Sequence, residues 1–479
     1  MTYFRKLVFL YCIILTMSFE AGAIDFQVKD LLVKSPVLDM FTPAGELHGL
    51  IVISRPENKS TPFLACNINL FQFKPDGSWS EAAIVKLPEN IAFIDAGDIN
   101  SDGFIDLVAT VPEALVVFLN NGAGSFKASQ TLLSESSVFG LLQGAGSGAG
   151  DNKAVRHKRL LYDVDRDGRL DVLLPWIKST IIRFQDQDGS YPDNLKTELP
   201  IEVYCEVVGR DSKNISLAVS LPFIEDINSD GRSDVALFSG NGYRFYLQNE
   251  DRKFSTLDWN FKGDFTLNDY RPRVVPDLDG DGWLDIIMLI TERKEGEMSA
   301  SGSIAIFLHQ SSGYPTVPTT SLKSEMIFEG VNVIDMDGNG LPDLSVPAMK
   351  FGLGMIVSAF RGKNKFTNLI YLQQKRGTFN SVPEMSNFTV YNEYALFSQE
   401  GDFNGDGRND FLLATEKDEL SIFKAGTKKG FDSKPWKIFT LDVSSKYHIF
   451  DVNKDGISDI VVSGEKVKSN HFKIILSKK

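Results

Sequence analysis

The stretch DVDRDGRLDVLLP, residues 163–175, joins a polar turn directly to an apolar run. Aspartates occupy positions one, three, five and nine of the stretch, and a glycine occupies position six. The residues that follow, VLLP, have no polar side chain. A near copy, DINSDGRSDVALF, occupies residues 226–238, so the chain repeats the pattern.

The pattern D-x-[DN]-x-[DN]-G-x-x-D occurs seven times at intervals of 49 to 67 residues. A short apolar segment precedes each copy, and an apolar run follows it. Such runs are typical of strands that are buried on both faces. A third strand and an Asn/Gly turn come next, as in VVFLNNGAGSF (residues 116–126), and a weaker fourth strand leads to the next copy. Each repeat therefore predicts four antiparallel strands.

Four-stranded units repeated around an axis form a β-propeller, so we expect an all-β chain with that fold. The Asp-rich loop should join the first and second strands of each blade. Upstream, VLDMFTPAGELHGLIVIS (residues 37–54) resembles a degenerate repeat in which Phe41 and Pro43 replace the acidic residues. This favours eight blades, one without the motif, over the alternative of seven blades and an N-terminal extension. The last repeat is one strand short, and residues 24–34 could supply that strand and close the ring.

The loop chemistry predicts calcium. Oxygen atoms at positions one, three, five and nine, with the backbone carbonyl at position seven, suit Ca²⁺, and the glycine permits a sharp turn. We expect about seven sites. The predicted ligand sets are Asp98, Asn100, Asp102, Phe104, Asp106; Asp163, Asp165, Asp167, Arg169, Asp171; Asp226, Asn228, Asp230, Arg232, Asp234; Asp277, Asp279, Asp281, Trp283, Asp285; Asp335, Asp337, Asn339, Leu341, Asp343; Asp402, Asn404, Asp406, Arg408, Asp410; and Asp451, Asn453, Asp455, Ile457, Asp459.

Three alternatives fit the loops less well. An EF-hand needs a glutamate at position twelve and flanking helices, but position twelve is apolar in every copy and lies in an expected strand. Zinc is disfavoured because the loops contain no His or Cys. A metal-free surface turn explains the polar residues but not the recurrent ninth aspartate, and it leaves crowded carboxylates that repel one another.

These loops and the VVFLNNGAGSF-type hairpins resemble FG-GAP/VCBS repeat proteins, including the propeller of integrin α-subunits. The resemblance covers nearly the whole chain after its first residues. It implies a propeller with structural calcium between the first two strands of a blade. It does not imply one activity, because such propellers occur in adhesins, lectin-like proteins and some polysaccharide-active enzymes.

The N-terminus reads as a secretory signal peptide. Basic Arg5 and Lys6 precede a short apolar run, and small residues end at Ala23, where we expect cleavage. The remainder, residues 24–479, would form a single propeller domain that is secreted, periplasmic or on the cell surface, without a transmembrane segment. Cys66 and Cys205 could pair there or remain two buried thiols.

The net charge of −13 argues against nucleic acid as a partner. After loss of residues 1–23 the charge becomes −14, which seven Ca²⁺ ions would balance. The negative net charge is therefore mostly due to the predicted calcium loops. We expect the protein to be a monomer.

No catalytic motif stands out, and the five histidines are scattered singly. We therefore expect a non-catalytic binding or adhesion module for a glycan or a protein. A propeller-fold polysaccharide lyase or hydrolase is one alternative, and a structural subunit of a surface assembly is another. Trp176 and Lys178, in LLPWIKST, should lie on the face opposite the loops together with the Gly-rich insertion of residues 140–159. Trp176 could stack on a sugar ring or a partner side chain there, or simply pack between blades.

Overall fold

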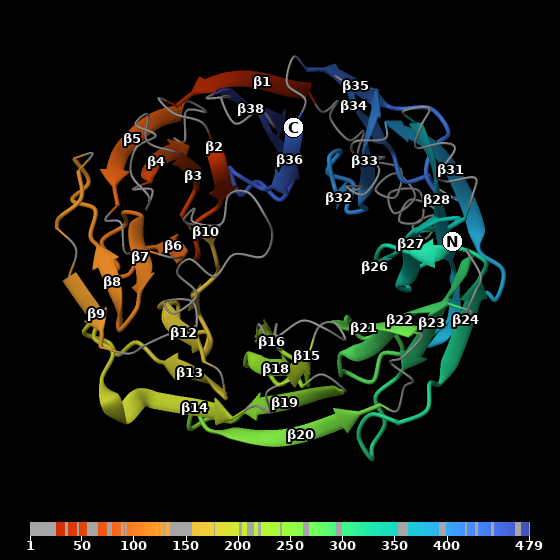
Figure 1. The fold of residues 1–479 in the computed structure, drawn as a ribbon, viewed down its shortest axis with the longest axis horizontal. Coiled ribbons are helices and arrows are strands. Elements are labelled where there is room, and N and C mark those ends of the chain that lie inside the picture. The colour runs from red at the N-terminus through yellow and green to blue at the C-terminus, as the bar shows by residue number, and fades with distance from the viewer. Residues whose placement is uncertain are drawn as a thin grey trace, which may run out of the picture.

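The computed structural model shows a ring of eight antiparallel sheets, or blades, and confirms the predicted eight-bladed propeller (Figure 1). In every blade except blade 2, where an added strand lies further inward, the first strand lies nearest the axis of the ring, and the fourth lies at its outer rim (Figure 1). The structure describes residues 25–478 except 34–36, 46, 55–65, 74–78, 88–90, 92, 124, 129, 135–155, 177, 201–203, 208–214, 219–221, 240–241, 262–267, 294–298, 353–362, 392–398, 417–418, 427–429, 442–444 and 465–470. The expected signal peptide and most of the Gly-rich insertion fall outside the described residues.

The first four blades follow one another along the chain. Blade 1 contains β2 (Val37–Phe41), β3 (Gly49–Ser54), β4 (Asn67–Phe73) and β5 (Trp79–Lys86). Blade 2 contains β6 (Phe93–Gly97), β7 (Asp106–Val111), β8 (Ala114–Phe118) and β9 (Gln130–Leu133), with β10 (Arg156–His157) added beside β6. Blade 3 contains β11 (Leu161–Tyr162), β12 (Asp171–Pro175), β13 (Ser179–Arg183) and β14 (Lys196–Pro200), with a 3₁₀ turn at Asp193–Leu195. Blade 4 contains β17 (Phe223–Glu225), β18 (Asp234–Phe238), β19 (Gly242–Gln248) and β20 (Phe254–Asn260).

The second half of the ring repeats this plan. Blade 5 contains β21 (Asn268–Val275), β22 (Asp285–Arg293), β23 (Ala300–Phe307) and β24 (Thr320–Ser324). Blade 6 contains β25 (Ile327–Phe328), β26 (Asn332–Ile334), β27 (Asp343–Met349), β28 (Lys363–Tyr371) and β31 (Glu384–Tyr391). Blade 7 contains β32 (Gln399–Gly401), β33 (Asp410–Glu416), β34 (Glu419–Phe423) and β35 (Lys437–Thr440). Blade 8 contains β36 (Ser445–Phe450), β37 (Asp459–Gly464), β38 (His471–Lys478) and β1 (Asp25–Leu32). Two small hairpins lie outside the blades, β15 (Tyr204–Val207) with β16 (Ile215–Ala218) and β29 (Gln373–Lys375) with β30 (Thr378–Phe379).

Burial follows the sequence pattern of each strand. The apolar second strands are buried on both faces, as in β12 and β27, where every residue is buried. The outer strands alternate instead, so that only Leu199 in β14 and only Phe439 in β35 is buried. A second strand is sandwiched between two neighbouring blades, whereas an outer strand turns one face to solvent.

Eight apolar clusters fill the interfaces between successive blades. The cluster between blades 2 and 3, for example, joins Val108 and Leu115 of blade 2 to Val172 and Leu174 of blade 3. The cluster between blades 8 and 1 likewise joins Val461 and Ile474 to core residues of β3. Because each interface is a hydrophobic core, burial between blades is the main force that holds the ring together.

The two ends of the described chain meet in blade 8. Strand β1 pairs antiparallel with β38 over eight residues, from Asp25 opposite Lys478 to Leu32 opposite His471. Figure 1 shows the N-terminal strand in red beside the blue C-terminal strands. This pairing gives the last blade its fourth strand and leaves the ring closed.

The segment after the Gly-rich insertion is anchored near the axis. Strand β10 pairs in parallel with β6, and the carboxylate of Asp95, which is fully buried, receives Arg159 Nη1 at 3.0 Å and His157 Nε2 at 3.3 Å. Backbone N–H groups of Leu160 and Leu161 also donate to Asp95. These contacts hold the start of blade 3 against the inner strand of blade 2.

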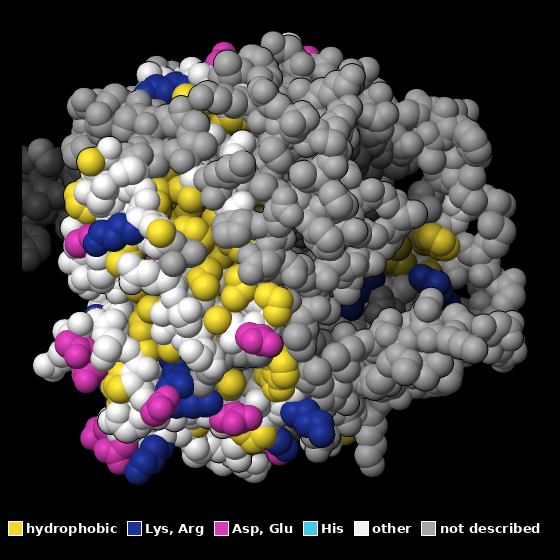
Figure 2. Space-filling view, turned by 60° about the vertical axis from the view of Figure 1, so that its left-hand side comes forward, with side chains coloured by type: hydrophobic (Ala, Val, Ile, Leu, Met, Phe, Trp, Pro, Cys, Tyr) yellow, Lys and Arg dark blue, Asp and Glu magenta, His cyan; other side chains and the backbone are white. Residues whose placement is uncertain are grey.

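The side of the ring that carries blades 1 to 3 shows Lys and Arg side chains beside Asp and Glu side chains, with apolar side chains between them (Figure 2). In the described residues, no helix has the length and hydrophobicity needed to cross a membrane.

Candidate metal-binding loops

All seven Asp-rich loops join the first two strands of a blade and share one backbone conformation. Each loop has two residues with positive φ, between 53° and 89°, at its fourth and sixth positions. The sixth residue is always glycine, for which this region is unstrained. The fourth residues are Ser101, Arg166, Ser229, Gly280, Gly338, Gly405 and Lys454, so four of the seven are not glycine. The sequence predicted the turn at position six but not the second one at position four.

The first aspartate of each loop holds the turn closed. In the loop of residues 163–171, Asp163 accepts hydrogen bonds from the backbone N–H groups of Asp167 at 3.0 Å and Gly168 at 2.9 Å. The bond from the position-six glycine recurs in all seven loops at 2.8–2.9 Å. The seventh residue also donates its N–H to the fifth side chain in every loop. This common network fixes the directions of the carboxylates before any ligand is considered.

The ninth aspartate is fully buried in every loop and links three parts of its blade. Asp171 accepts the N–H of Val164 at 2.8 Å and the N–H of Gln185, just after the third strand, at 2.9 Å. The same pair of bonds recurs in the other six loops, at Asp106, Asp234, Asp285, Asp343, Asp410 and Asp459. The recurrence of this aspartate thus has a structural reason in addition to any role as a metal ligand.

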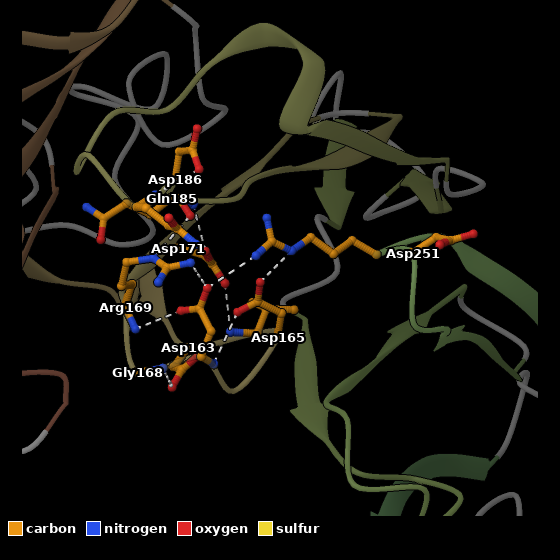
Figure 3. Close-up of polar contacts among 12 residues, drawn as sticks. Asp163, Asp165, Gly168, Arg169, Asp171, Gln185, Asp186 and Asp251 are labelled. Atoms are coloured by element: carbon orange, nitrogen blue, oxygen red, sulfur yellow. Dashed lines mark hydrogen bonds and ion pairs between the residues drawn. The ribbon is translucent and has the colours of Figure 1, made fainter.

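In three loops the carboxylates converge. Oxygen atoms lie within 4.8 Å of one another in three groups, Asp163 with Asp165 and Asp171, Asp277 with Asp279 and Asp285, and Asp335 with Asp337 and Asp343. Figure 3 shows Asp163, Asp165 and Asp171 gathered in the turn beside Arg169 and Gln185. Burial, assisted by repulsion from neighbouring carboxylates, raises the pKa of Asp171 to about 8 and that of Asp285 to about 7.

A divalent cation fits these groups. It would offset both the lost hydration and the mutual repulsion of the carboxylates. The donors are hard oxygen atoms only, which favours a hard cation over a softer metal. Each of the three groups could therefore hold a metal ion.

The fifth-position side chains have other partners. Asp406 pairs with Arg408 at 3.0 Å, Asp281 pairs with His309 Nδ1 at 3.0 Å, and Asp167 pairs with Arg169. In the loops of residues 163–171 and 277–285, the fifth aspartate lies outside the convergent group.

Four loops have asparagine at position three, and in three of them its amide donates to the fifth-position aspartate. In the fourth, Asn404 Nδ2 donates instead to the buried Asp410 at 3.1 Å. These amides donate hydrogen bonds that stabilise the carboxylates they contact without cancelling their charge.

The second residue of each loop was not recognised from the sequence as functional. It is apolar and almost fully buried in all seven copies, at Ile99, Val164, Ile227, Leu278, Met336, Phe403 and Val452. Each one packs into the cluster between its own blade and the next, as Leu278 does between blades 5 and 6. The sequence did contain a signal for this role, because every copy has an apolar residue at position two, between the polar positions one and three. It shows that the loop is tied to the core between blades.

The corresponding loop of blade 1 has a different chemistry. Phe41, at the end of β2, is buried in the core between blades 1 and 2 and stacks on the ring of His157 at a centroid distance of 3.9 Å. The N–H of Ala44 donates to Ala96 O at 2.7 Å. This loop thus docks on blade 2 by apolar and backbone contacts.

Trp176 and Lys178 lie at the end of β12 remote from its Asp-rich loop, and Lys178 is exposed. Trp176 is half-buried against the cluster between blades 2 and 3, and its backbone N–H donates to Ser179 O at 2.7 Å. Part of its ring therefore packs between blades, and part faces solvent.

Comparison with known families agrees with this geometry. An FG-GAP-like repeat profile matches residues 98–174, 226–288, 277–346 and 402–462, which together span more than half of the chain. The chain belongs to the FG-GAP-like repeat family. Each match starts at the first aspartate of one loop and ends three residues after the ninth aspartate of the next. All seven loops of this FG-GAP-like propeller thus fall inside matched regions.

Several solved structures are similar to this FG-GAP-like chain at low identity. A lectin of Agrocybe aegerita, described for its specific recognition of non-reducing terminal N-acetylglucosamine, has 18% identity over 88% of this chain and 94% of the lectin, with a TM-score of 0.42. The biofilm matrix protein Bap1 of V. cholerae has 10% identity over 96% of this chain and 89% of its own, with a TM-score of 0.31. A Lactobacillus plantarum protein has 9% identity over 83% and 97%, with a TM-score of 0.35. No curated protein sequence matches the chain.

Proposed function

We propose that this protein is an exported, calcium-stabilised propeller that acts as a non-catalytic binding module. The observation that carries the proposal is the convergence of three carboxylates in each of three loops, within a loop conformation that all seven copies share. Calcium is the ion of choice because the donors are hard carboxylate oxygens and the loops contain no His or Cys. Extracellular modules of this type bind Ca²⁺ at about 0.1–1 mM, which suits an exported protein.

Calcium has a structural role in this proposal. The first aspartate closes the turn, the ninth aspartate holds the third strand, and the second residue packs between blades. An ion that binds these carboxylates only in the folded chain stabilises the loop and the interface between blades together.

Chelation tests the calcium proposal. Thermal unfolding of residues 24–479 should shift upward by several degrees when Ca²⁺ replaces EGTA, in proportion to the logarithm of free Ca²⁺ above its dissociation constant. Mg²⁺ at the same concentration serves as the control, since its strict octahedral geometry and reluctance to lose water make it a poorer fit. A melting temperature that is equal in EGTA and Ca²⁺ would contradict the proposal.

The binding surface that we propose is the face opposite the Asp-rich loops. The segments on that face are not part of the repeated sequence pattern. Among them, Trp176 has a partly exposed ring and lies two residues before the exposed Lys178. Such a ring can stack on the apolar face of a sugar or on a partner side chain.

A glycan array and a protein pull-down, each with and without Ca²⁺, test this surface. Trp176→Ala should remove binding to any ligand so found, while Trp436→Ala, at the half-buried outer rim of blade 7, should preserve it. Equal binding by wild type and Trp176→Ala would refute the proposed face. Sequencing the N-terminus of the exported chain tests cleavage after Ala23.

A further inference from the structure

The Asp-rich loop of blade 3 receives a guanidinium from the next blade. Arg252, between β19 and β20 of blade 4, places Nε 2.6 Å from Asp165 Oδ2 and Nη2 3.2 Å from Asp167 Oδ2. Asp165 belongs to the convergent group with Asp163 and Asp171. Figure 3 shows Asp251, the residue before Arg252, on the neighbouring blade beyond Asp165.

The structure holds Arg252 in place from several sides. Its backbone has a φ of 59°, and its N–H donates to Asn249 O at 3.1 Å in the turn. Its guanidinium lies 5.4 Å from the ring centroid of the buried Phe184, within cation–π range. Asp165 is only 9% exposed at its side chain, so the ion pair is largely shielded from water.

The loop of residues 277–285 in blade 5 provides an internal comparison. It has the same four aspartates at positions one, three, five and nine, and three of them converge in the same way. Among the described residues, no lysine or arginine forms an ion pair with its third-position Asp279. Arg376, between β29 and β30, does reach this loop, but its Nη1 donates to the backbone oxygen of Gly280 at 3.4 Å. The two loops thus offer the same carboxylates with and without a guanidinium paired to the third-position aspartate.

The contact between blades 3 and 4 is reciprocal. Arg166, the fourth residue of the blade 3 loop, reaches the loop of blade 4, where its Nη1 lies 3.3 Å from Gly231 O and 3.6 Å from Asp226 Oδ2. Its Nε lies 3.3 Å from Ser233 Oγ. Each of these two blades therefore contributes an arginine to the acidic loop of the other.

We propose that Arg252 is a resident counter-ion that competes with Ca²⁺ for the loop of residues 163–171 and bridges blades 3 and 4 when that loop is free of the ion. This inference rests on the proposed calcium function and refines it. A calcium ion held by Asp163, Asp165 and Asp171 would lie close to the guanidinium on Asp165, and repulsion between the two cations opposes their binding together. The loop therefore fills at a higher free Ca²⁺ concentration than the loop of residues 277–285.

Equilibrium dialysis of the full exported chain against buffered Ca²⁺ tests this competition. Arg252→Gln should lower the free Ca²⁺ at which one of the ions binds by about tenfold or more, equivalent to about 1.4 kcal/mol for each factor of ten. Adding Asp163→Asn to that variant should abolish the tighter binding step, which assigns that step to this loop. Arg252→Lys keeps the charge but lacks the planar guanidinium that can pair with both aspartates. Its calcium affinity should lie between those of wild type and Arg252→Gln.

Lys253→Gln is the matched control, because Lys253 lies in the same turn and is 77% exposed at its side chain, 3.9 Å from Asp251. It should leave the binding curve unchanged. As a second readout, Arg252→Gln should lower the melting temperature more in EGTA than in saturating Ca²⁺, since the bridge acts only in the ion-free loop.

Weaker or unchanged calcium binding in Arg252→Gln would overturn the inference, because the arginine would then support the site or play no part in it. That result is distinct from failure of the proposed function, in which neither wild type nor any variant would bind Ca²⁺ at millimolar concentration.

Discussion

The attachment of each loop to the core between blades can be tested at Leu278. This residue is 1% exposed and packs in the cluster between blades 5 and 6. Its N–H donates to the buried Asp285 at 2.7 Å, and its carbonyl accepts from Gln373 Nε2 at 3.0 Å and from the N–H of Gly377 at 3.1 Å. Its flanking residues include the candidate ligands of the loop. Leu278→Ala should therefore weaken both the interface and calcium binding.

The expected size follows from the lost packing. Three buried carbons at about 0.8 kcal/mol each amount to about 2.5 kcal/mol, and the residual cavity brings the loss to about 2.5–5 kcal/mol. Denaturant unfolding in saturating Ca²⁺ and in EGTA, followed by tryptophan fluorescence and circular dichroism together, measures the change. Agreement between the two probes establishes that the chain unfolds cooperatively enough for such a comparison.

Val317→Ala is the control, because this side chain is 71% exposed, and its loss should alter the free energy of unfolding by less than about 0.5 kcal/mol. Equal destabilisation by the two variants would refute the placement of Leu278 in the core. A destabilised Leu278→Ala protein with an unaltered calcium titration would show that the core does not support the loop.

Three further substitutions test other features of the fold. Ser101→Gly should raise the free energy of unfolding by about 0.5–1 kcal/mol, because glycine adopts the φ of 57° at this exposed position without strain. Gly242→Ala should lose several degrees in melting temperature, because its Cβ would lie 1.8 Å from the backbone oxygen of Trp259. Arg159→Gln should lower the free energy of unfolding by about 1–3 kcal/mol, because the fully buried Asp95 would lose a charged partner. This range allows for the partial exposure of the arginine.

Each of these substitutions has a matched control. Ser255→Gly, at an exposed site within β20, should destabilise the chain by about 0.5–1 kcal/mol, the opposite of Ser101→Gly. In Gly103→Ala the added Cβ would have no atom within 4 Å, so only the positive φ opposes the change. The melting temperature should therefore fall less than in Gly242→Ala. Lys158→Gln should leave stability close to wild type. Equal results within any of these pairs would contradict the reasoning behind it.

The repeated loops were sufficient to predict the propeller, its strand plan and the number of blades. The blade without the motif was recognisable because its apolar second strand persists although Phe41 and Pro43 replace the acidic residues. Burial of that strand depends on hydrophobic side chains rather than on the loop, so the pattern of the core survives the loss of the aspartates.

Contacts between repeats were not predictable in the same way. The approach of Arg252 to Asp165 depends on the placement of two turns in different blades, which no spacing along one repeat specifies. The parallel pairing of β10 with β6 likewise arises from an insertion that occurs in one repeat only. Positive φ at Arg166 and Lys454 gave no signal, because the sequence marks such conformations only where glycine is present.

The pairing of β1 with β38 has a consequence for the order of folding. The partners Asp25 and Lys478 are more than 450 residues apart, so this contact closes the longest loop in the described chain. The other blades are each built from one continuous segment and can form locally as the chain emerges. Blade 8 has to wait for both ends. We therefore expect completion of the ring to be a slow, non-local step, before which the unpaired edges of β1 and β38 are open to another chain.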